Sequence, residues 1–400
     1  MLLIDAFGSR WRLDVSGLEP DLAAHLEDLW RRASIPEDAA SAAGDGSATP
    51  EFVVTRGEDT LIVLNEEVVV VTDDELPYAV SRAVTHASIL RRTGTCLMLH
   101  AAGFASPDGA TVALVAPSGT GKTTAARVLG RRLGYVSDET VAVEDDLRVR
   151  AYAKPLSVVV DPAEPMAKTE HSPDELGLLR APDDLHLVAT VVLERTDDVE
   201  EPVLEPFALV DAAALALPQT SALPSLERPL ERLATVLTAG HGPWRMRYRE
   251  IGDCAALVED LAAGRAPGGE PETVQWTWIG GTAPASAAVL DPSEDVDPPE
   301  PREHGDLAAI GIATEVVRAP FGDALASDGS VLVLHERVPS TLPGLAATLW
   351  LAAEHPVPVS RLVEEATADL GPHPEAEALV IDAVRSLVER DLLRVAAEDD

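Results

Sequence analysis

The sequence predicts an α/β core, preceded by a small β-rich unit and followed by a separate α+β module of three strands and three helices. Three observations support this fold class. An apolar run at residues 111–115 leads through a loop with two glycines into a helix-forming segment. A stretch rich in Pro, Gly and acidic residues at 265–305 cannot form a core. Beyond this stretch, short apolar runs are followed by three amphipathic stripes.

These patterns divide the chain into four segments. We expect the β-rich unit at residues 1–75, the α/β core at 76–264, a linker at 265–305 and the C-terminal module at 306–400.

The first segment has strand patterns and one helix. Apolar runs at residues 61–64 and 68–71 flank three polar residues, which predicts a β-hairpin. Residues 39–49 are rich in Ala, Gly and Ser and predict a loop. Apolar residues recur at helical spacing over residues 76–92, so we expect a helix that enters the core.

The core opens with two predicted strands, at residues 97–100 and 111–115. A turn sequence at 106–109 separates them, so we expect them to be adjacent. Later strands are expected near Val136 and at residues 141–143, 156–160, 187–193 and 245–248. Helices are expected at residues 211–217, 228–237 and 255–263.

The C-terminal module begins with predicted strands at residues 314–318, 323–326 and 331–335. The last two flank a tight turn at 327–329. With only three strands in view, we expect the third to expose an unpaired backbone edge. Three helical stripes follow, starting at Leu342, Val359 and Val380, and Gly371-Pro372 separates the second from the third.

Composition excludes several functional classes. The 400 residues carry a formal net charge of −37, which argues against general affinity for nucleic acid or anionic membranes. The two cysteines, Cys96 and Cys254, suggest a reducing compartment without a disulfide framework. No apolar run approaches the length of a membrane span, so we expect a cytoplasmic protein.

Residues 116–124 read Ala-Pro-Ser-Gly-Thr-Gly-Lys-Thr-Thr, between a strand and a helix. This is the pattern of a P-loop, whose backbone N–H groups converge on nucleotide phosphates at a helix N-terminus. Lys122 can reach the β- and γ-phosphates, and the Thr123 hydroxyl can bind Mg²⁺. The chain has only three lysines, so one in this loop is informative. The expected nucleotide-binding residues are Ser118, Gly119, Thr120, Gly121, Lys122, Thr123 and Thr124.

An acidic pair, Asp138 and Glu139, follows the short strand near Val136. If this strand lies beside the P-loop strand, one carboxylate can accept the proton of an incoming hydroxyl while the other helps to hold Mg²⁺. The simpler alternative is a solvated strand end or a helix cap.

Together with His100, these motifs resemble the kinase domain of the HPr kinase/phosphorylase family. The segments His100-Ala101-Ala102-Gly103, residues 116–124 and Val136-Ser137-Asp138-Glu139 occur in the family's order and near its spacing. The resemblance covers roughly residues 95–260. It implies ATP and Mg²⁺ as cofactors and Asp138 as catalytic base. It also implies that Glu139 and Thr123 serve Mg²⁺, and that His100 lies close to the transferred phosphate.

Four arginines could also offer a guanidinium to phosphate. Arg195 ends a predicted strand, and Arg245, Arg247 and Arg249 alternate along one face of another. We favour a surface ladder that neutralises nearby acidic residues.

The C-terminal module is acidic, which disfavours DNA binding by a winged-helix-like fold. Its pattern resembles the PqqD-like family, also called RiPP recognition elements, in residues 328–334, the helix at 342–350 and residues 382–393. Such modules bind a leader peptide as an added strand. The resemblance implies peptide binding by Val331, Leu332, Val333, Leu334, Val380, Val384 and Leu387.

We therefore expect an ATP-dependent kinase that phosphorylates a Ser or Thr of a ribosomally made precursor peptide. One alternative is an HPr-type regulatory serine kinase whose tail only oligomerises. Another is a non-catalytic, nucleotide-dependent peptide chaperone. The sequence leaves the peptide, the choice of ATP over GTP and any homo-oligomer open.

Overall fold

A computed structural model of the chain describes residues 1–36, 49–56, 60–64, 67–117, 120–159, 168–266, 273–281, 306–335 and 338–396. The chain forms two compact units. The first unit comprises Met1–Phe207, Gln219–Leu226 and Val236–Glu272. The second comprises Ala208–Pro218, Glu227–Thr235 and Thr273–Asp400. Two short segments of the predicted core are therefore grouped with the C-terminal module.

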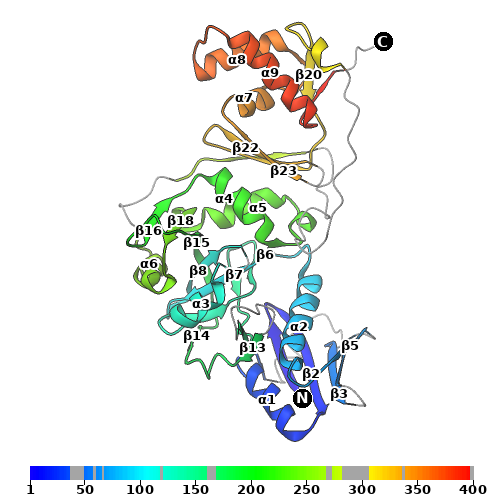
Figure 1. The fold of residues 1–400 in the computed structure, drawn as a ribbon, viewed down its shortest axis with the longest axis vertical. Helices are drawn as coiled ribbons and strands as arrows, with labels where there is room; N and C mark the ends of the chain where they lie inside the picture. Colours follow the sequence, from blue (N-terminus) through cyan, green and yellow to red (C-terminus); the bar gives the residue numbers. More distant parts are fainter. Residues whose placement is uncertain are drawn as a thin grey trace. The chain divides into compact units, whose positions relative to one another are not determined.

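The β-rich N-terminal part forms one five-stranded sheet in the order β1-β2-β3-β4-β5 (Figure 1). Its strands are β1 (Leu2–Ala6), β2 (Ser9–Gly17), β3 (Glu51–Arg56), β4 (Thr60–Leu64) and β5 (Glu67–Val71). The predicted hairpin is confirmed by the antiparallel β4–β5 pair. The predicted loop at 39–49 lies outside the described residues except for its last position.

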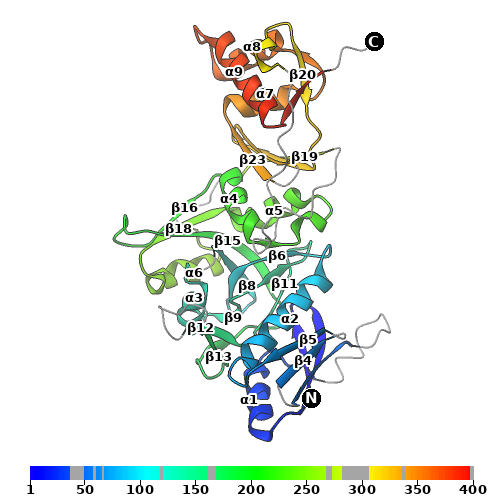
Figure 2. The same ribbon diagram turned by 45° about the vertical axis from the view of Figure 1, so that its right-hand side comes forward.

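Two helices pack on this sheet, α1 (Pro20–Trp30) and α2 (Leu76–Arg92) (Figures 1 and 2). Their apolar stripes meet the sheet in one core, which holds Trp30 from α1, Val84 from α2 and Trp11 from β2. The bounds of α2 match the predicted helix at 76–92.

The central sheet has seven strands in the order β14-β9-β7-β8-β15-β18-β16. They are β7 (Ala101–Ala105), β8 (Ala110–Val115), β9 (Gly134–Ser137), β14 (Leu179–Arg180), β15 (His186–Arg195), β16 (Val203–Pro206) and β18 (Trp244–Tyr248). Helices α3 (Lys122–Leu129) and α6 (Ala255–Ala262) bury their apolar faces in the core of this sheet. The predicted α/β core is therefore present.

The strand directions in this sheet bring the sequence motifs together at one end of the strands. Strand β7 pairs antiparallel with both β8 and β9, so it begins where those two strands end. His100 precedes β7, the P-loop follows β8, and Asp138 follows β9. All three motifs therefore meet at the same edge, as open α/β sheets commonly place their ligand sites.

The predicted pairing of the strand at 97–100 with the strand at 111–115 is wrong, because the two lie in different sheets. Residues 97–99 form β6 (Leu97–Leu99), which does not pair with β8. It belongs to a four-stranded sheet β11-β10-β6-β17, with β10 (Val141–Val143), β11 (Val149–Arg150) and β17 (Thr220–Ser221). The strand that pairs with β8 through the turn at 106–109 is β7. The chain changes sheets at His100, a switch that an apolar run does not reveal.

A two-stranded hairpin of β12 (Leu156–Val159) and β13 (Lys168–His171) completes the sheets of the first unit. Both cysteines of this unit, Cys96 and Cys254, are buried and free. None of the helices in the described part of the chain is long and apolar enough to cross a membrane.

The second unit contains a four-stranded sheet in the order β19-β21-β22-β23 and a three-stranded sheet in the order β24-β20-β25. The strands are β19 (Thr277–Gly280), β20 (Glu315–Arg318), β21 (Asp323–Ser327), β22 (Ser330–His335), β23 (Val338–Pro343), β24 (Val357–Pro358) and β25 (Leu393–Val395). Three helices, α7 (Leu345–Ala352), α8 (Val359–Leu370) and α9 (Ala376–Glu389), share one core with both sheets. The predicted helices are confirmed, although the first begins three residues after Leu342, which lies in β23.

The prediction of an open edge on residues 331–335 is wrong. Strand β22 pairs with β21 on one side and with β23 on the other. The expected peptide-binding residues are instead buried in the second unit: Val331, Leu332, Val333, Leu334, Val380, Val384 and Leu387. The two prolines in residues 338–343 concealed the fourth strand, because proline is unfavourable inside a sheet.

Two helices from the middle of the chain belong to the second unit, apart from the last two residues of the second helix. They are α4 (Leu209–Ala216) and α5 (Pro229–Leu237), and α4 packs on β21, β22 and β23. A strand from the predicted linker belongs to it as well, because β19 pairs antiparallel with β21. The rest of the linker, except 265–266, 273–276 and 281, lies outside the described residues.

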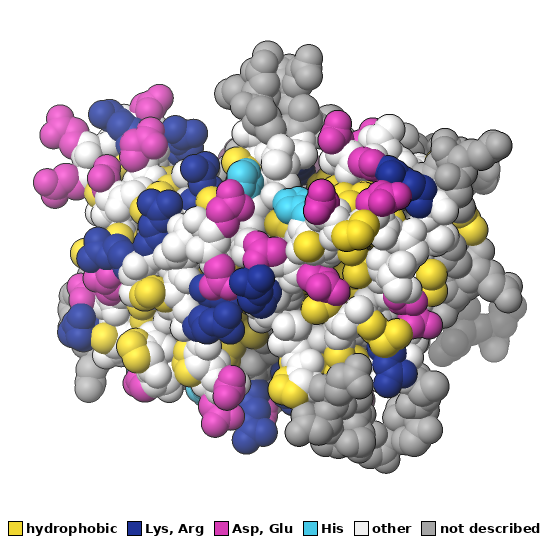
Figure 3. Space-filling model, turned by 90° about the horizontal axis from the view of Figure 1, so that it is seen from below, with side chains coloured by type: hydrophobic (Ala, Val, Ile, Leu, Met, Phe, Trp, Pro, Cys, Tyr) yellow, Lys and Arg dark blue, Asp and Glu magenta, His cyan; other side chains and the backbone are white. Residues whose placement is uncertain are grey.

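On the face drawn in Figure 3, Lys and Arg side chains are interspersed with Asp and Glu. The coloured side chains do not form a continuous basic stripe of the kind that follows a phosphate backbone.

Candidate functional site

The phosphate-binding loop connects β8 to α3. Gly121 has φ of 102°, in the left-handed region where a side chain would be strained. Among the described residues, no atom lies within 4 Å of a Cβ placed at this position. Of the predicted nucleotide-binding residues, Ser118 and Gly119 lie outside the described part of the chain, while residues 120–124 have the expected loop-to-helix placement.

Lys122 lies folded against its own loop. Its ammonium donates to the carbonyl oxygens of Ala116, at 2.7 Å, and Pro117, at 3.1 Å. The side chain is 7% exposed, and burial lowers its pKa to about 8. Because charge-assisted bonds to phosphate are stronger than bonds to neutral carbonyls, an arriving nucleotide can draw this ammonium away from the loop.

Asp138 joins the end of β9 to the start of the P-loop helix. Its Oδ2 accepts a hydrogen bond from the Thr123 hydroxyl at 3.2 Å, and its Oδ1 accepts one from Tyr135 at 2.8 Å. The carboxylate is only 4% exposed. Both of its oxygens are therefore held before any ligand binds.

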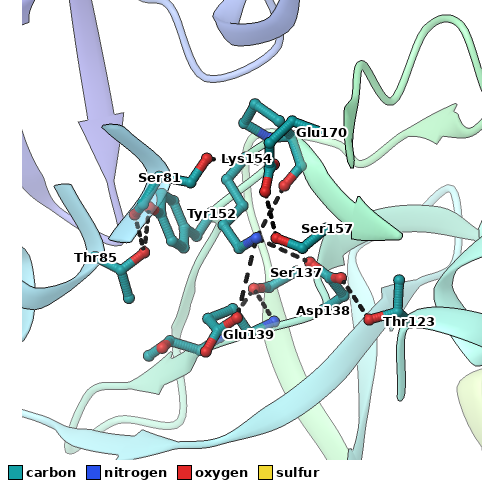
Figure 4. A network of polar contacts seen from close by, with 12 residues as sticks. Ser81, Thr85, Thr123, Ser137, Asp138, Glu139, Tyr152, Lys154, Ser157 and Glu170 are labelled. Atoms are coloured by element: carbon teal, nitrogen blue, oxygen red, sulfur yellow. Dashed lines mark hydrogen bonds and ion pairs between the residues drawn. The ribbon is translucent and has the colours of Figure 1, made fainter. Parts of the chain in front are cut away.

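The ammonium of Lys154 lies between Glu170 and the acidic pair (Figure 4). Its Nζ is 3.7 Å from Asp138 Oδ1 and 3.9 Å from Glu139 Oε2, and it donates to the Pro155 carbonyl at 2.9 Å. The side chain is 2% exposed. Burial alone would lower the pKa of Lys154, but the charges of Asp138, Glu170 and Glu139 together raise it above its usual value.

Glu170, from β13, is the third carboxylate around this ammonium. It accepts hydrogen bonds from Ser157 on β12 and from Ser81 on α2. Burial raises its pKa, while the charge of Lys154 opposes that rise. A hydrogen bond of 2.8 Å between Thr85 and Tyr152 adds a second link between α2 and the segment that carries Lys154. The N-terminal part thus reaches the acidic pair through buried polar contacts.

His100 faces Glu139 from the switch point between the two sheets. Its Nδ1 is 3.5 Å from Glu139 Oε1, and its backbone N–H donates to the Gln219 carbonyl at 2.7 Å. Burial and the charge of Lys122 lower the pKa of His100, so its imidazole is neutral at pH 7. Glu139, with a side chain 38% exposed, is the more accessible of the two carboxylates.

The donor set at this edge suits a hard divalent cation bound together with phosphate. Mg²⁺ takes few protein ligands, commonly one or two carboxylates, and completes its shell with water and phosphate oxygens. The Thr123 hydroxyl and the carboxylates of Asp138 and Glu139 supply such a set. Within the described residues, no cluster of three or more His, Cys, Asp or Glu could hold a metal by itself.

The four arginines form the ladder that the sequence favoured. Arg245 pairs with Glu205 and Glu194, and Arg247 pairs with Glu194 and Asp198. The other two pair likewise: Arg195 with Glu250, and Arg249 with Asp197. These charges are occupied by neighbouring acidic residues.

Sequence reasoning missed three residues of this site, namely Tyr135, Lys154 and Glu170. The sequence held one signal for Lys154, namely the rarity of lysine in this chain, which has three in 400 residues. Two of the three, Lys122 and Lys154, are buried near the acidic pair. The roles of Tyr135 and Glu170 depend on packing and had no sequence signal.

No protein-family model matches the chain, and no curated protein matches it. Among solved structures, the HPr(Ser) kinase/phosphatase from Coxiella burnetii aligns with 42% of this chain and 93% of its own. The identity is 10% and the TM-score 0.24, so the likeness is weak and carries no argument about fold or activity. The geometry of the site must carry the functional argument.

Proposed function

We propose that the chain is an ATP- and Mg²⁺-dependent kinase that phosphorylates a Ser or Thr hydroxyl of a ribosomally synthesised precursor peptide. The observation that carries the proposal is the 3.2 Å hydrogen bond between Thr123 and Asp138. It joins the first turn of the phosphate-loop helix to an acidic pair, the arrangement in which P-loop enzymes hold Mg²⁺.

Each group has a task in this reaction. Lys122 and the backbone of the loop would neutralise the β- and γ-phosphates, and Mg²⁺ held by Thr123 and Asp138 would offset the charge of the transferred group. The acceptor hydroxyl must lose its proton to a nearby base. His100, beside the phosphate loop, would lie close to the transferred phosphoryl group, with its Nδ1 directed at Glu139.

The geometry favours Glu139 as this base, although the family resemblance assigns that role to Asp138. Asp138 is buried and already accepts two hydrogen bonds. Glu139 is more exposed, and its Oε1 faces His100. Only a carboxylate that a substrate can approach can take its proton.

The second unit would hold the leader peptide, in keeping with the resemblance of its sequence to PqqD-like modules. Among the described strands this sheet ends at β19 and at β23, and we assign the added strand to β23, which pairs directly with the predicted peptide-binding strand at residues 331–335. Pro339 and Pro343 lack an N–H and lie at alternate positions with Thr341, which places these three on the outer side. Thr341 is then the one donor of that edge within Val338–Pro343.

The proposal is tested with purified full-length chain, Mg²⁺ and γ-labelled ATP. Transfer of label to Ser- or Thr-containing precursor peptides is expected, and Lys122→Ala should abolish it. The same substitution should weaken ATP binding in calorimetry by roughly 10- to 100-fold, because a hydrogen bond to a charged group is worth about 1.5–3 kcal/mol. ATP affinity that is unchanged in Lys122→Ala would contradict the P-loop assignment.

Two alternatives predict different outcomes. A nucleotide-dependent peptide chaperone would bind ATP and peptide without transferring label. An HPr-type regulatory serine kinase would transfer label equally well to peptides with and without a leader. The acidic pair beside the loop favours transfer over mere binding, because a chaperone needs no base at that position.

A further inference from the structure

We propose that Lys154 is a positioning residue for the phosphoryl transfer. Its buried ammonium holds one oxygen of each carboxylate in the acidic pair and so aims the other oxygen at the reacting groups. The inference rests on the proposed kinase function and concerns the same site.

The contacts divide each carboxylate in the same way (Figure 4). Lys154 lies nearest to Oδ1 of Asp138, while Oδ2 meets Thr123 on the phosphate-loop helix. It lies nearest to Oε2 of Glu139, while Oε1 meets His100. One ammonium therefore fixes the orientation of both side chains, and the oxygens that it leaves free are those that face Thr123 and His100.

Lys154 acts from behind the site and does not touch substrate. It is 2% exposed, and its remaining hydrogen bond goes to the Pro155 carbonyl. A second observation shows that this place is built for an ammonium. Glu170, with hydrogen bonds from Ser157 and Ser81, supplies a buried counter-charge that takes no part in the acidic pair.

The charges of these four side chains explain why Lys154 and Glu170 occur together beside the acidic pair. Lys154 and Glu170 balance each other, so Asp138 and Glu139 together leave two negative charges. These two charges would face the Mg²⁺ of Mg·ATP, while Lys122 would offset part of the charge of the phosphates. Before Mg·ATP binds, the ammonium keeps two neighbouring carboxylates from repelling each other out of place.

The test compares Lys154→Met with the double variant Lys154→Met/Glu170→Gln. The single change leaves Glu170 as an unpaired buried charge, so Tm should fall. The double change removes both charges, so Tm should recover. In both variants kcat should remain about 10- to 100-fold below wild type, the scale on which loss of a supporting group around a metal site lowers activity, with no rise in KM for Mg·ATP.

Metal affinity provides the readout that a structural role would not produce. Mn²⁺ is titrated into each protein with a non-hydrolysable ATP analogue and followed by electron paramagnetic resonance. Loss of a nearby positive charge should tighten Mn²⁺ binding several-fold while turnover falls. A structural lesion would weaken both. Lys168→Met, the same change at a lysine outside the site, should match wild type.

The proposal is overturned if the double variant retains wild-type kcat, or if its Mn²⁺ affinity falls together with its turnover. Failure of the kinase proposal has a different signature. In that case the wild-type chain transfers no label, while Mn²⁺ affinity and Tm still report whether Lys154 organises the pair.

Discussion

At the residue scale, the question is how Asp138 and Glu139 divide their work. Asp138 is held by Thr123, Tyr135 and Lys154, which suits a ligand whose position must not change. The side chain of Glu139 has ion-pair contacts with Lys154 and His100 and is 38% exposed. The two carboxylates are neighbours in sequence and unlike in environment, a difference that separates the roles of paired acidic residues.

This difference predicts distinct phenotypes for two conservative substitutions. Glu139→Gln should lower kcat by roughly 100-fold or more, the scale of a lost general base, with Mg·ATP affinity within a few-fold of wild type. Asp138→Asn should weaken Mg·ATP binding as well, because it removes a charge that faces the metal. Single-turnover rates and nucleotide titrations measure the two effects. The reverse pattern would return the base role to Asp138.

Residue identities in this site were predictable only where a motif carries them. The P-loop and the acidic pair were found because their spacing and strand context are fixed by phosphate chemistry. Lys154, from a segment between two sheets, reaches the pair only through the folded path of the chain. No local pattern encodes such a contact.

At the element scale, many apolar strands and the hairpins at residues 61–71 and 323–335 were predicted, while several strands and one pairing were not. The strand predicted at 97–100 was paired wrongly with the strand at 111–115, and β7 was missed, because β6 and β7 are both apolar and only His100 separates them. Strand β23 was missed because Pro339 and Pro343 mask it. Strand β19 was missed because it lies within residues 265–305, whose composition predicts a linker. Its clearest apolar signal was Trp278, a side chain large enough to pack against a neighbouring strand.

Asp323 explains how β19 is held. Its side chain accepts hydrogen bonds from Trp278 on β19 and from the backbone N–H of Leu230 on α5. The ring of Trp278 also stacks under Arg228, 4.7 Å from its guanidinium carbon. One buried carboxylate thus ties three segments of the second unit together.

Burial raises the pKa of Asp323 to about 6 from 3.8, and the nearby Glu231 adds to the rise. The folded state then binds a proton more tightly than the unfolded state, so stability from this group is present at low pH and lost as pH rises from about 4 to 6. Over this pH range the contribution of Asp323 to the free energy of unfolding falls by about 3 kcal/mol, which is about 100-fold in the folding equilibrium. Hydrogen exchange of β19 and β21 amides, corrected for intrinsic rates, should show protection falling by up to that factor.

Asp323→Asn should flatten this pH dependence, because an amide does not ionise. Asp328→Asn, at an exposed position of the same unit, is the matched control and should leave the profile unchanged. A profile that stays steep in Asp323→Asn would assign the pH dependence to another group.

At the scale of the whole molecule, the two units interleave along the chain. Helices α4 and α5 belong to the second unit, yet the segment between them, Gln219–Leu226, belongs to the first. Its strand β17 pairs with β6, and Gln219 accepts the hydrogen bond from His100. Hydrophobic periodicity places these helices correctly but does not say which sheet they cover. Deleting residues 306–400 would strip α4 of the sheet on which it packs, so truncation is a poor test of the peptide-binding role.

A single substitution on the outer edge of β23 tests that role without disturbing either core. Thr341→Pro removes the one outward N–H of the strand, so an added peptide strand loses a backbone hydrogen bond worth about 1 kcal/mol and meets the proline ring. KM for the full precursor should rise about tenfold, the effect of 1.4 kcal/mol. Phosphorylation of a leaderless peptide should be unchanged.

Two control variants, at Thr341 itself and at the adjacent Ser340, show whether the rise in KM comes from the outward N–H. Thr341→Val keeps the N–H and loses only the hydroxyl, so it should behave as wild type. Ser340→Pro removes an N–H on the inner side, where Ser340 pairs with Val333, and should lower Tm through the sheet itself. If Thr341→Pro and wild type phosphorylate the full precursor with the same KM, the leader does not pair with β23. The second unit would then serve the enzyme by some means other than strand addition at this edge.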